Sequence, residues 1–363
     1  MRILLIVHRF HPNLFYPVKS LVDYGYVVAL IVPKVDTYVN LIEDHSILKP
    51  IYLEYDQLNY SFVNQIIASL KPDLIIQRYF SKKWKYFWFI GMLKGVKCIS
   101  YEQNPQESND LIRQYTRPFR RLLRGEPLRK FTPVLNKGRP GRFNEPFSTY
   151  IPFPIEQFVH NIDNRTYFPK GIVRVLCVGK LGQKRKNHLQ VLNVLESLDY
   201  NVSLSFVGAG PSFVFTDQEY FNELQQRCNS SPLKGGVSVQ MDFSYSEMVH
   251  VYLNHDILVF PAVREDHGQA VLEALSAGCV VIATDDCGAA GYIVNDYSGK
   301  VYERNNTEEL KAAIRFFLED PNRILEYSAA AIQTIRENHS GVSFANAISK
   351  LVNIKKSIGA KNI

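Results

Sequence analysis

Short apolar runs of strand length alternate with longer segments of helical periodicity along most of the chain. In the first half, the strand-like runs are almost continuously apolar and β-branched, which is typical of parallel strands buried on both faces. The predicted strands there are residues 2–7, 26–32, 73–77 and 96–100, and the predicted helices are residues 60–70 and 82–93. This order predicts a layered α/β domain.

The same alternation starts again in the second half. The predicted strands are residues 171–179, 202–208, 237–240, 256–260, 279–284 and 299–302, with helices at 187–198, 269–278, 307–320, 322–338 and 343–358. Two consecutive series predict an α/β protein of two doubly wound, Rossmann-like domains. The length of 363 residues agrees, because a single hydrophobic core rarely extends beyond about 250–300 residues.

The join between the two series is expected at residues 150–158, YIPFPIEQF, where three aromatic residues and two prolines interrupt the pattern. We therefore expect one domain over residues 1–150 and a second over residues 151–340. Ligands of open parallel sheets bind beyond the C-terminal ends of the strands. Two such domains facing each other across a cleft would place a site there, so the residues that follow each strand are the candidates for function.

Composition narrows the class of protein. Hydrophobic residues make up 46% and charged residues 21%, which is ordinary for a folded, soluble protein. No apolar run approaches the roughly 18 residues that span a bilayer, and MRILLIVHRF is a poor signal peptide. Five scattered cysteines without a C-x-x-C pair indicate a reducing compartment. The net charge of +7 indicates an anionic partner: nucleotide phosphate, nucleic acid or an acidic membrane.

The first strand of the second series ends in a turn rich in glycine and lysine, VGKLGQKRKN. Gly179 permits close backbone approach, Lys180 follows it, and three cations at residues 184–186 precede the helix predicted at Asn187. Such a turn suits a diphosphate, because side-chain charge and the helix dipole both favour an anion. A solvated basic loop is an equally weighted alternative. The next strand ends in VGAGP, which adds Gly208.

The strand at residues 256–260 leads into a loop that contains Glu265 and then into a helix that contains Glu273. Gly268 lies at the turn between them and lets the first amides of the helix face a ligand. The other residues of this predicted binding turn are His267, Gln269, Ala270 and Val271.

Glu265 and Glu273 would not share a proton, since eight helical residues rise roughly 12 Å. They would instead hold separate parts of one extended ligand, while amides and lysines bind its middle. A nucleotide sugar has this shape, with hydroxyls at both ends and a diphosphate between them. The alternative is that Glu273 pairs with a lysine and Glu265 is solvated.

Three segments in order, VGKLGQKRKN, LSFVGAGP and FPAVREDHGQAVLEALSAGCVVIATDDCG, resemble the donor-binding half of the family 4 glycosyltransferases, which are retaining enzymes with the GT-B fold. The resemblance implies that Glu265 contacts hydroxyls of the transferred sugar and that Glu273 contacts the ribose diol. It also implies that Lys180 and Lys186 neutralise the diphosphate leaving group.

The resemblance further implies that residues 1–150 bind the acceptor and that residues 151–340 bind the nucleotide sugar. The last helix, within residues 341–363, would cross back to the first domain. A UDP-sugar is favoured over a GDP-sugar as donor. No D-x-D motif is present, so no metal is expected to be required, with the lysines in its place.

The chain departs from the family pattern at several positions. Lys180 stands where the family usually has arginine, and Asn187 replaces a common glycine. Tyr292 stands near a position that is often acidic, a variant that resembles the lipopolysaccharide-core and capsule hexosyltransferase branch. The adjacent Asp285 and Asp286 are expected to start a helix.

The acceptor side offers Glu102 and Gln103, which follow the predicted strand at residues 96–100. Glu102 could orient or deprotonate the acceptor hydroxyl, or it could pair with a nearby arginine, and the sequence does not choose. His8 and His11 follow the first strand and could line the cleft, although a surface position is the commoner outcome for a histidine.

Residues 111–142 hold ten lysines and arginines and one acid, Glu126. In LIRQYTRPFRRLLRG, cations and apolar residues recur at helical intervals: Arg113, Arg117, Arg120, Arg121 and Arg124, with Tyr115, Phe119 and Leu122. Basic amphipathic helices of this kind lie on anionic membranes, where each cation adds about 1 kcal/mol. A solvated helix whose apolar side packs on the sheet is the alternative.

The sequence therefore predicts a retaining hexosyltransferase that uses a nucleotide-diphosphate sugar and a glycan or lipid-linked acceptor in cell-surface polysaccharide synthesis. A sugar-nucleotide epimerase on the same fold is the alternative. A nucleic-acid-binding protein is disfavoured, because acids in the binding cleft would repel phosphates. We expect a cytoplasmic enzyme that could attach to the inner face of the membrane.

Overall fold

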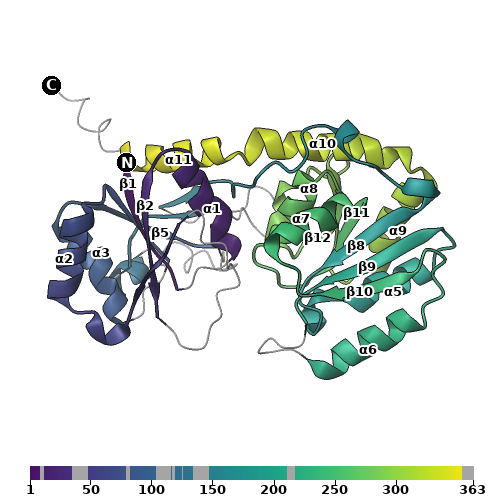
Figure 1. The fold of residues 1–363 in the computed structure, drawn as a ribbon, viewed down its shortest axis with the longest axis horizontal. Coiled ribbons are helices and arrows are strands. Elements are labelled where there is room, and N and C mark those ends of the chain that lie inside the picture. Colours follow the sequence, from purple (N-terminus) through teal and green to yellow (C-terminus); the bar gives the residue numbers. More distant parts are fainter. Residues whose placement is uncertain are drawn as a thin grey trace. The chain divides into compact units, whose positions relative to one another are not determined.

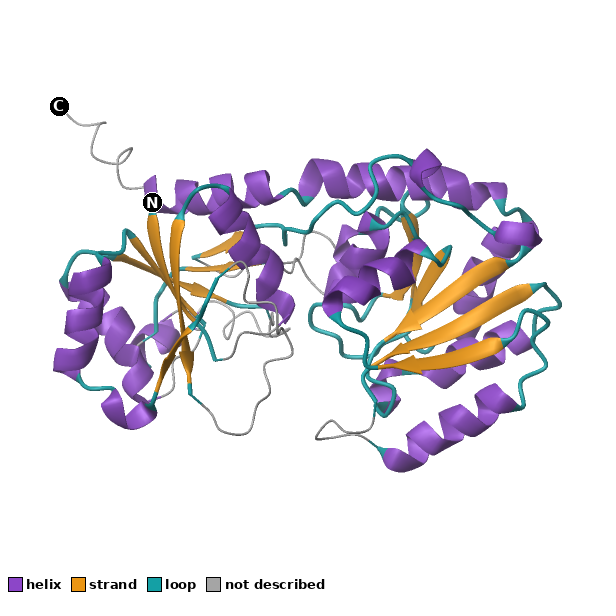
Figure 2. Ribbon diagram, viewed as in Figure 1, coloured by secondary structure: helices purple, strands orange, loops and turns teal. Residues whose placement is uncertain are grey.

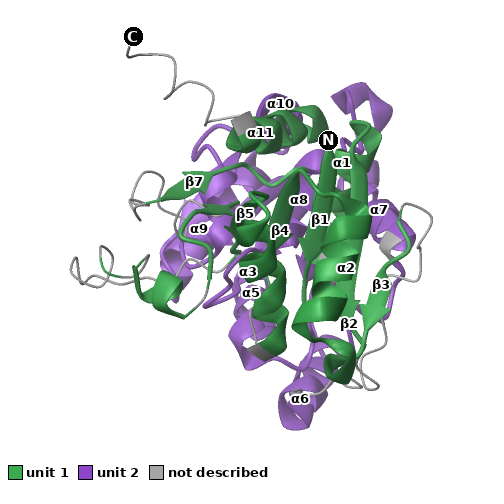
Figure 3. Cartoon of the chain, turned by 90° about the vertical axis from the view of Figure 1, so that its left-hand side faces the viewer, with its two compact units in different colours: residues 1–133, 143–154, 339–363 green, residues 134–142, 155–338 purple. Residues whose placement is uncertain are grey.

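The computed structural model describes residues 1–8, 12–34, 48–78, 82–103, 116, 119–124, 126–133, 147–210 and 217–353. The chain forms two compact units, which are coloured separately in Figure 3. Unit 1 comprises Met1–Pro133, Phe143–Pro154 and His339–Ile363, and unit 2 comprises Val134–Arg142 and Ile155–Asn338. Each unit contains one parallel β-sheet with helices on both faces (Figure 2).

The sheet of unit 1 has seven described strands, all paired in parallel, in the order β3-β2-β1-β4-β5-β6-β7. They are β1 (Arg2–Ile6), β2 (Val27–Pro33), β3 (Ile51–Leu53), β4 (Leu74–Gln77), β5 (Lys97–Tyr101), β6 (Lys130–Thr132) and β7 (Ser148–Tyr150). Leu4 pairs with Ala29 on one side and Ile75 on the other, so apolar side chains line up across the strands. The order runs outward from β1 in both directions, as in a doubly wound sheet.

Helices cover both faces of this sheet (Figure 1). α2 (Tyr60–Leu70) and α3 (Lys85–Leu93) pack together on one face, and α1 (Pro12–Asp23) contacts α11 (Gly341–Asn353) on the other. Two 3₁₀ turns, η1 (Tyr55–Gln57) and η2 (Lys82–Trp84), precede α2 and α3. The apolar cluster beneath α2 and α3 includes Ile6, Ile31, Val63, Ile75, Phe87 and Ile90.

The sheet of unit 2 has six described strands, again all parallel, in the order β10-β9-β8-β11-β12-β13. They are β8 (Val173–Val178), β9 (Val202–Gly208), β10 (Val237–Met241), β11 (Ile257–Phe260), β12 (Val280–Thr284) and β13 (Gly299–Tyr302). Both sheets therefore confirm the predicted fold class of two doubly wound α/β domains.

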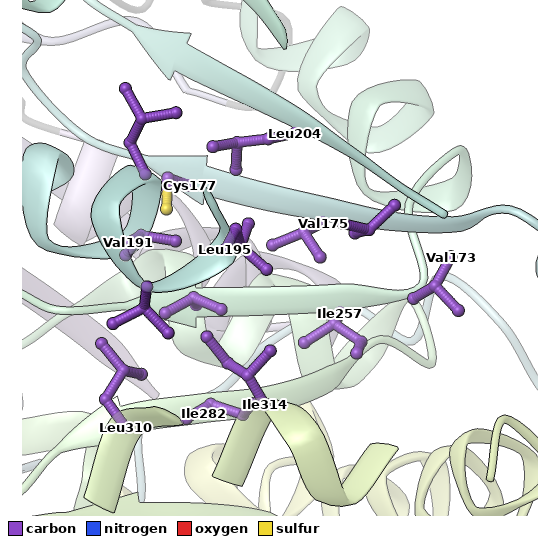
Figure 4. Packing of buried hydrophobic residues seen from close by; sticks show 14 of the residues in the cluster. Val173, Val175, Cys177, Val191, Leu195, Leu204, Ile257, Ile282, Leu310 and Ile314 are labelled. Atoms are coloured by element: carbon purple, nitrogen blue, oxygen red, sulfur yellow. The ribbon is translucent and has the colours of Figure 1, made fainter. Parts of the chain in front are cut away.

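The helices of unit 2 are α5 (His188–Glu196), α6 (Gln218–Asn229), α7 (Tyr245–Leu253), α8 (Gln269–Ser276), α9 (Thr307–Glu319) and α10 (Asn322–Asn338). Its 3₁₀ turns are η3 (Ile162–Asn164), η4 (Pro169–Gly171), η5 (Lys184–Lys186) and η6 (Gly288–Tyr292). Figure 4 shows Val175 and Ile257 from neighbouring strands packed against Leu195 of α5 and Ile314 of α9, all fully buried. This core supports the loops at the ends of the central strands.

Periodicity located most of the regular elements but not all of them. α2 and α10 begin and end at the predicted residues. Elements that the sequence did not reveal are β3, β6, β7, α1, α6 and α7. The three strands have three residues each, too few for a pattern, and α1 contains Pro17.

The last helix belongs to unit 1. Tyr24 Oη donates a hydrogen bond to Asn346 Oδ1 of α11 at 2.5 Å, and Lys97 Nζ donates to the Val352 carbonyl at 2.9 Å. The chain passes from unit 1 to unit 2 between Pro154 and Ile155. That point lies inside the segment where the sequence pattern is interrupted.

Candidate active site

The C-terminal edge of the unit 2 sheet brings together the loops that follow β8 and β11. Lys186, in η5, has its ammonium nitrogen 2.5 Å from Glu265 Oε2, and Arg185 Nη1 lies 2.8 Å from the same oxygen. Lys186 is only 9% exposed, so this ion pair is largely enclosed. The predicted basic turn and the predicted loop glutamate therefore form one cluster, and neither Lys186 nor Glu265 is merely solvated.

Backbone hydrogen bonds fix the loop that carries Glu265. Val263 N donates to the Arg185 carbonyl at 2.8 Å, which joins this loop to the turn after β8. Glu265 N donates to the Asp286 carbonyl at 3.1 Å, and Gly288 N donates to the Glu265 carbonyl at 2.9 Å. The glutamate is thus held from the loops of both strands that flank β11.

The two cations determine the charge of Glu265. Burial alone would raise its pKa, but Lys186 and then Arg185 outweigh burial and lower the pKa to about 2. The side chain is therefore a carboxylate at neutral pH, able to accept hydrogen bonds but not to donate a proton.

Helix α8 starts at a left-handed glycine. Gly268 is its N-cap, with φ 70° and ψ 52°. A Cβ at this position would lie 2.4 Å from Cys287 Sγ, so both the backbone angle and the available space favour glycine. The Val271 amide donates to the Gly268 carbonyl at 3.0 Å. The Gln269 and Ala270 amides open the helix, where no preceding turn supplies a carbonyl.

Glu273 lies inside α8 and is 8% exposed. Tyr252 Oη donates to its Oε2 at 2.7 Å, and Gln269 Nε2 donates to its Oε1 at 2.7 Å. Burial raises the pKa of Glu273, and these two hydrogen bonds oppose that rise only in part. The alternative in which Glu273 pairs with a lysine is therefore wrong in this structure.

The spacing argument for the two glutamates needs correction. Only Gln269 onward is helical, so the rise expected for eight helical residues does not apply between Glu265 and Glu273. The two carboxylates nevertheless have separate partners: Glu265 contacts Lys186 and Arg185, whereas Glu273 contacts neutral donors. They do not form a shared-proton pair.

The turns after β8 and β9 touch through their backbones. Gly179 N donates to the Val207 carbonyl at 3.0 Å, and a Cβ on Gly208 would lie 1.6 Å from the Gly179 carbonyl oxygen. Only glycine fits at position 208. The stem of Lys186 fills the space beside Gly179, and the half-buried Lys180 follows it. The predicted residues of both turns therefore lie at one edge of the sheet.

The polar candidates of unit 1 follow β5. Glu102 forms an ion pair with Lys130 of β6, with Lys130 Nζ 2.6 Å from Glu102 Oε2. Of the two expectations for Glu102, the structure shows pairing, although with a lysine rather than an arginine. Gln103 is buried and donates to Tyr101 Oη at 2.7 Å and to the Asn13 carbonyl at 3.0 Å.

The three histidine candidates differ in their surroundings. His8 is exposed after β1, whereas His267 is 3% exposed beside Gly268. His11 lies outside the described residues.

The basic segment is described only at residues 116, 119–124 and 126–133. Arg121 is buried, donates to Ser100 Oγ, and lies 3.6 Å from Glu126 Oε2. The exposed apolar residues are Phe119, Leu122 and Leu123. Arg121 is thus not a surface cation, and the apolar side does not pack on the sheet at these positions. The predicted members Arg113, Tyr115 and Arg117 lie outside the described residues.

Two features are absent from the part of the chain that the structure describes. It contains no helix long and apolar enough to cross a bilayer. Nor does it contain a group of three or more His, Cys, Asp and Glu side chains placed to hold a metal ion.

The whole site of unit 2 lies within one family match. Residues 160–337 match the family described as glycosyl transferases group 1, and this range contains Lys186, Glu265, Gly268 and Glu273. The match covers just under half of the chain, so the second half of the chain is similar to the group 1 glycosyl transferases. This confirms the resemblance seen in the sequence.

Relatives of this glycosyl transferase segment match over part of the chain. The chain is 27% identical over 149 residues to sulfoquinovosyl transferase SQD2 of Arabidopsis thaliana, which covers 40% of this chain and 26% of the relative. It is 26% identical over 145 residues to the capsular polysaccharide biosynthesis glycosyltransferase CapM of Staphylococcus aureus. This match covers 39% of this chain and 36% of the relative.

A third relative is N,N'-diacetylbacillosaminyl-diphospho-undecaprenol alpha-1,3-N-acetylgalactosaminyltransferase of Campylobacter jejuni. It is 32% identical over 88 residues, which are 24% of this chain and 23% of the relative. The matches thus span between 23% and 36% of the length of these relatives.

Solved structures resemble the chain over nearly its whole length. A glycosyltransferase from Rickettsia africae has a TM-score of 0.73 at 16% identity, covering 99% of both chains. Anabaena Alr3699/HepE, solved in complex with UDP, has a TM-score of 0.73 at 14% identity, covering 97% of this chain and 100% of the other. At these identities the likeness shows the fold alone, which is the GT-B fold.

Sequence reasoning assigned no role in the site to three residues of the matched range. Arg185 lies in the predicted basic turn, so its charge was a usable signal. Tyr252 lies on α7, and the capping box of Ser244 and Glu247 was a usable signal for the start of that helix. Asp286 braces the Glu265 loop, because its Oδ2 accepts from Arg264 N at 2.8 Å and from Arg304 Nη1 at 3.2 Å. The N-cap of η6 is Cys287, so the helix start expected at Asp286 is displaced.

Proposed function

We propose that this chain is a retaining hexosyltransferase that moves a sugar from a nucleotide-diphosphate donor to a glycan or lipid-linked glycan in cell-surface polysaccharide synthesis. The observation that carries the proposal is the enclosed Lys186–Glu265 pair beside the start of α8, inside a group 1 glycosyl transferase segment. It combines a fixed anion, a fixed cation and helix amides at the C-terminal edge of a parallel sheet.

In this proposal the donor diphosphate binds at the turn after β8. Lys186 then exchanges its bond to Glu265 for a bond to phosphate oxygen. Lys180 and the Gln269 and Ala270 amides face the same anion. As the bond from the sugar C1 to the diphosphate breaks, its electron pair leaves with the diphosphate. The acceptor oxygen bonds to C1 from the face that the diphosphate leaves, and its proton passes to an oxygen of the departing diphosphate. Fixed cations stabilise the leaving group more in the transition state than in the ground state.

Glu265 is proposed to contact the hydroxyls of the transferred sugar. Its lowered pKa supports this role, because the ionised carboxylate accepts hydrogen bonds over the whole neutral range. Its negative charge would also oppose the positive character that the sugar ring develops during transfer. Release of Lys186 to the diphosphate would leave this charge free to act on the sugar.

Glu273 is proposed to bind the ribose diol. Tyr252 and Gln269 each occupy one lone pair of a carboxylate oxygen, and each oxygen can accept a second hydrogen bond. Two hydroxyls on neighbouring ribose carbons match two carboxylate oxygens. The contacts from Tyr252 and Gln269 would hold the carboxylate in position before the donor arrives.

The donor is proposed to be a UDP-sugar that binds without a metal. HepE, which shares the fold, has been solved with UDP. Lys180, Arg185 and Lys186 would supply the positive charge that a divalent ion supplies in other transferases. If so, transfer should be unaffected by EDTA and by added Mg²⁺, whereas loss of activity in EDTA that Mg²⁺ restores would show a metal requirement.

The acceptor is proposed to be reached at the cytoplasmic face of a membrane, with residues 111–142 in contact with lipid. Exposed Phe119, Leu122 and Leu123 beside Arg120 and Arg124 support this part of the proposal. The name of the Campylobacter relative, which includes a diphospho-undecaprenol, supports a lipid-linked acceptor. Glu102 would act on the acceptor hydroxyl only after leaving Lys130.

The proposal is tested by a donor panel followed by a transfer assay. UDP should raise the unfolding temperature more than GDP or ADP, since a ligand that binds only the folded state stabilises it. Release of UDP from UDP-hexoses is then measured with and without membrane glycolipid extract, and the anomeric configuration of the product is read by NMR. A protein that binds none of the three nucleotides would exclude this function.

A further inference from the structure

Helix α3 presents apolar side chains to solvent. Phe89, Met92 and Leu93 are 42%, 47% and 60% exposed. Their spacing of three and four residues places them along one side of the helix. The side of α3 that holds it on the sheet consists of Phe87, Ile90 and Gly91, all buried. The fold therefore does not need the exposed side to be apolar.

The charged residues of α3 and of its C-cap are all positive. Lys85 lies in the first turn of α3 and Lys94 at its C-cap, so a lysine flanks the apolar residues at each end. Residues 60–101, which contain α2 and α3, carry six lysines, one arginine and a single acid, Asp73. The Asp73 carboxylate accepts a hydrogen bond from Arg2 N at 2.7 Å.

The neighbouring helix adds no negative charge. α2 lies beside α3 on the same face of the sheet, and Figure 3 shows both helices at the front of unit 1. Its sequence, YSFVNQIIASL, contains no charged residue. An approaching anionic surface would therefore meet apolar groups and lysines here but no carboxylate on either helix.

We infer that α3 binds the surface of an anionic lipid bilayer. Phe89, Met92 and Leu93 would enter the headgroup region, and Lys85 and Lys94 would contact lipid phosphates. A bilayer fits this surface better than a protein partner, because lysine is depleted at protein interfaces, whereas apolar residues with lysines at the edge are typical of the membrane boundary. The residues of this surface are not those of the basic segment at 119–124, and the inference requires no sugar transfer.

The test is co-sedimentation of the full chain with vesicles, without nucleotide. Vesicles of phosphatidylcholine with phosphatidylglycerol should bind the wild type, and vesicles of phosphatidylcholine alone should bind it at least about tenfold more weakly. The variants Phe89→Ser/Met92→Ser/Leu93→Ser and Lys85→Glu/Lys94→Glu should each weaken binding to anionic vesicles by about tenfold or more. Since Phe89, Met92, Leu93 and Lys94 are exposed and Lys85 is only half-buried, the unfolding temperature should stay close to that of the wild type.

Two control variants make the result specific. Val342→Ser removes another exposed apolar residue of unit 1, 60% exposed on α11, and should leave binding unchanged. The second control, Leu122→Ser/Leu123→Ser, removes exposed apolar residues of the basic segment, so it measures how much of the vesicle binding comes from that segment and how much from α3. Retention of vesicle binding by both α3 variants would overturn the inference, as would equal loss with Val342→Ser or no binding by the wild type. Loss of self-association instead of vesicle binding in the α3 variants would show a protein interface and also overturn it.

Discussion

The loop after β11 and the first turns of α8 each carry one glutamate, and the two meet opposite surroundings. Glu265 in the loop contacts two cations, which lower its pKa to about 2 despite burial. Glu273 in the helix contacts a tyrosine hydroxyl and an amide, and burial raises its pKa. The two glutamates lie on one short segment, but their partners differ and their pKa values shift in opposite directions.

The difference lies in the partners rather than in burial, since both side chains are largely enclosed. A charged partner fixes the charge of Glu265, whereas neutral partners fix only the orientation of Glu273. In the proposed site, the first carboxylate would be a permanent anion next to the reacting sugar. The second would be a positioned acceptor for hydroxyls. Substitutions that remove one group at a time test whether the two glutamates differ in this way.

The largest effect is expected from removal of the helix glutamate. Glu273→Ala should lower transfer at least about a thousandfold, because the ribose loses its acceptor and the buried Tyr252 hydroxyl and the half-buried Gln269 amide lose theirs. The unfolding temperature should fall modestly, since the fold is held by the core beneath. Activity and thermal unfolding are measured together. Tyr252→Phe, which keeps the carboxylate, is the control and should lose far less activity; wild-type transfer by Glu273→Ala would remove the assignment.

Removal of the enclosed cation should come next. Lys186→Ala should lower kcat by about 10²–10³, as expected for loss of one preorganised group at a developing charge, and it should weaken UDP binding. Lys184→Ala is a matched control from the same turn, because Lys184 is exposed and pairs with Asp217 at 2.9 Å. Steady-state kinetics compare the two. Equal losses in both variants would show that the turn contributes only general positive charge.

Much of this contrast was accessible from sequence. Parallel strands end at the same edge of a sheet, so residues after β8 and β11 were expected to meet, and Lys186 contacts Glu265 as that rule implies. Gly268 was predicted at the turn because only glycine readily takes a left-handed angle there. These features depend on strand order and local backbone, which leave a pattern in the sequence.

The partners that set each pKa were harder to predict. Tyr252 lies on α7, an element missed by periodicity, so its hydroxyl could not be placed near Glu273. The pairing of Glu102 with Lys130 depends on β6, which has only three residues. Asp286 holds the Glu265 loop by hydrogen bonds between the loops after two neighbouring strands. The spacing of residues in the sequence does not predict such hydrogen bonds. Side-chain partners depend on which short elements pair, and short elements carry little pattern.

The pH dependence of stability should show the contrast directly. The folded pKa of Glu265, about 2, lies below its ordinary value of 4.5, so its contribution is complete above pH 4.5 and is lost as pH falls to 2. At about 1.4 kcal/mol per pH unit this is at most about 3–4 kcal/mol. The folded pKa of Glu273 lies above 4.5, so its contribution is complete below pH 4.5 and declines as pH rises through the folded pKa.

Unfolding free energies of Glu265→Gln and Glu273→Gln, measured against the wild type between pH 2 and pH 7, separate the two groups. The stability lost in Glu265→Gln should shrink as pH falls below 4.5. The difference between Glu273→Gln and the wild type should move in the opposite direction. Parallel pH profiles for the two variants would contradict the assignment of opposite pKa shifts.

The turn between the glutamates should tolerate no side chain. Gly268→Ala is expected to cost about 2 kcal/mol, in part from the left-handed backbone and in part from overlap with Cys287 Sγ. Gly236→Ala is the control, because Gly236 has φ +81° with nothing within 4 Å of a Cβ, and it should cost only about 1 kcal/mol. Unfolding midpoints compare them. Adding Cys287→Ala should recover part of the Gly268→Ala loss if overlap contributes.

The smallest effect is expected from the outer cation of the cluster. The Arg185 side chain is 44% exposed, against 10% for that of Lys186, and a bond to an exposed cation contributes at most about 1 kcal/mol because water screens it. Arg185→Ala should therefore weaken UDP binding only about threefold and leave Glu265 ionised at neutral pH, since Lys186 remains. Isothermal titration with UDP measures this. If Arg185→Ala weakened UDP binding as much as Lys186→Ala does, burial would not be what distinguishes the two cations. The difference between Glu265 and Glu273 would then depend only on how many cations each contacts.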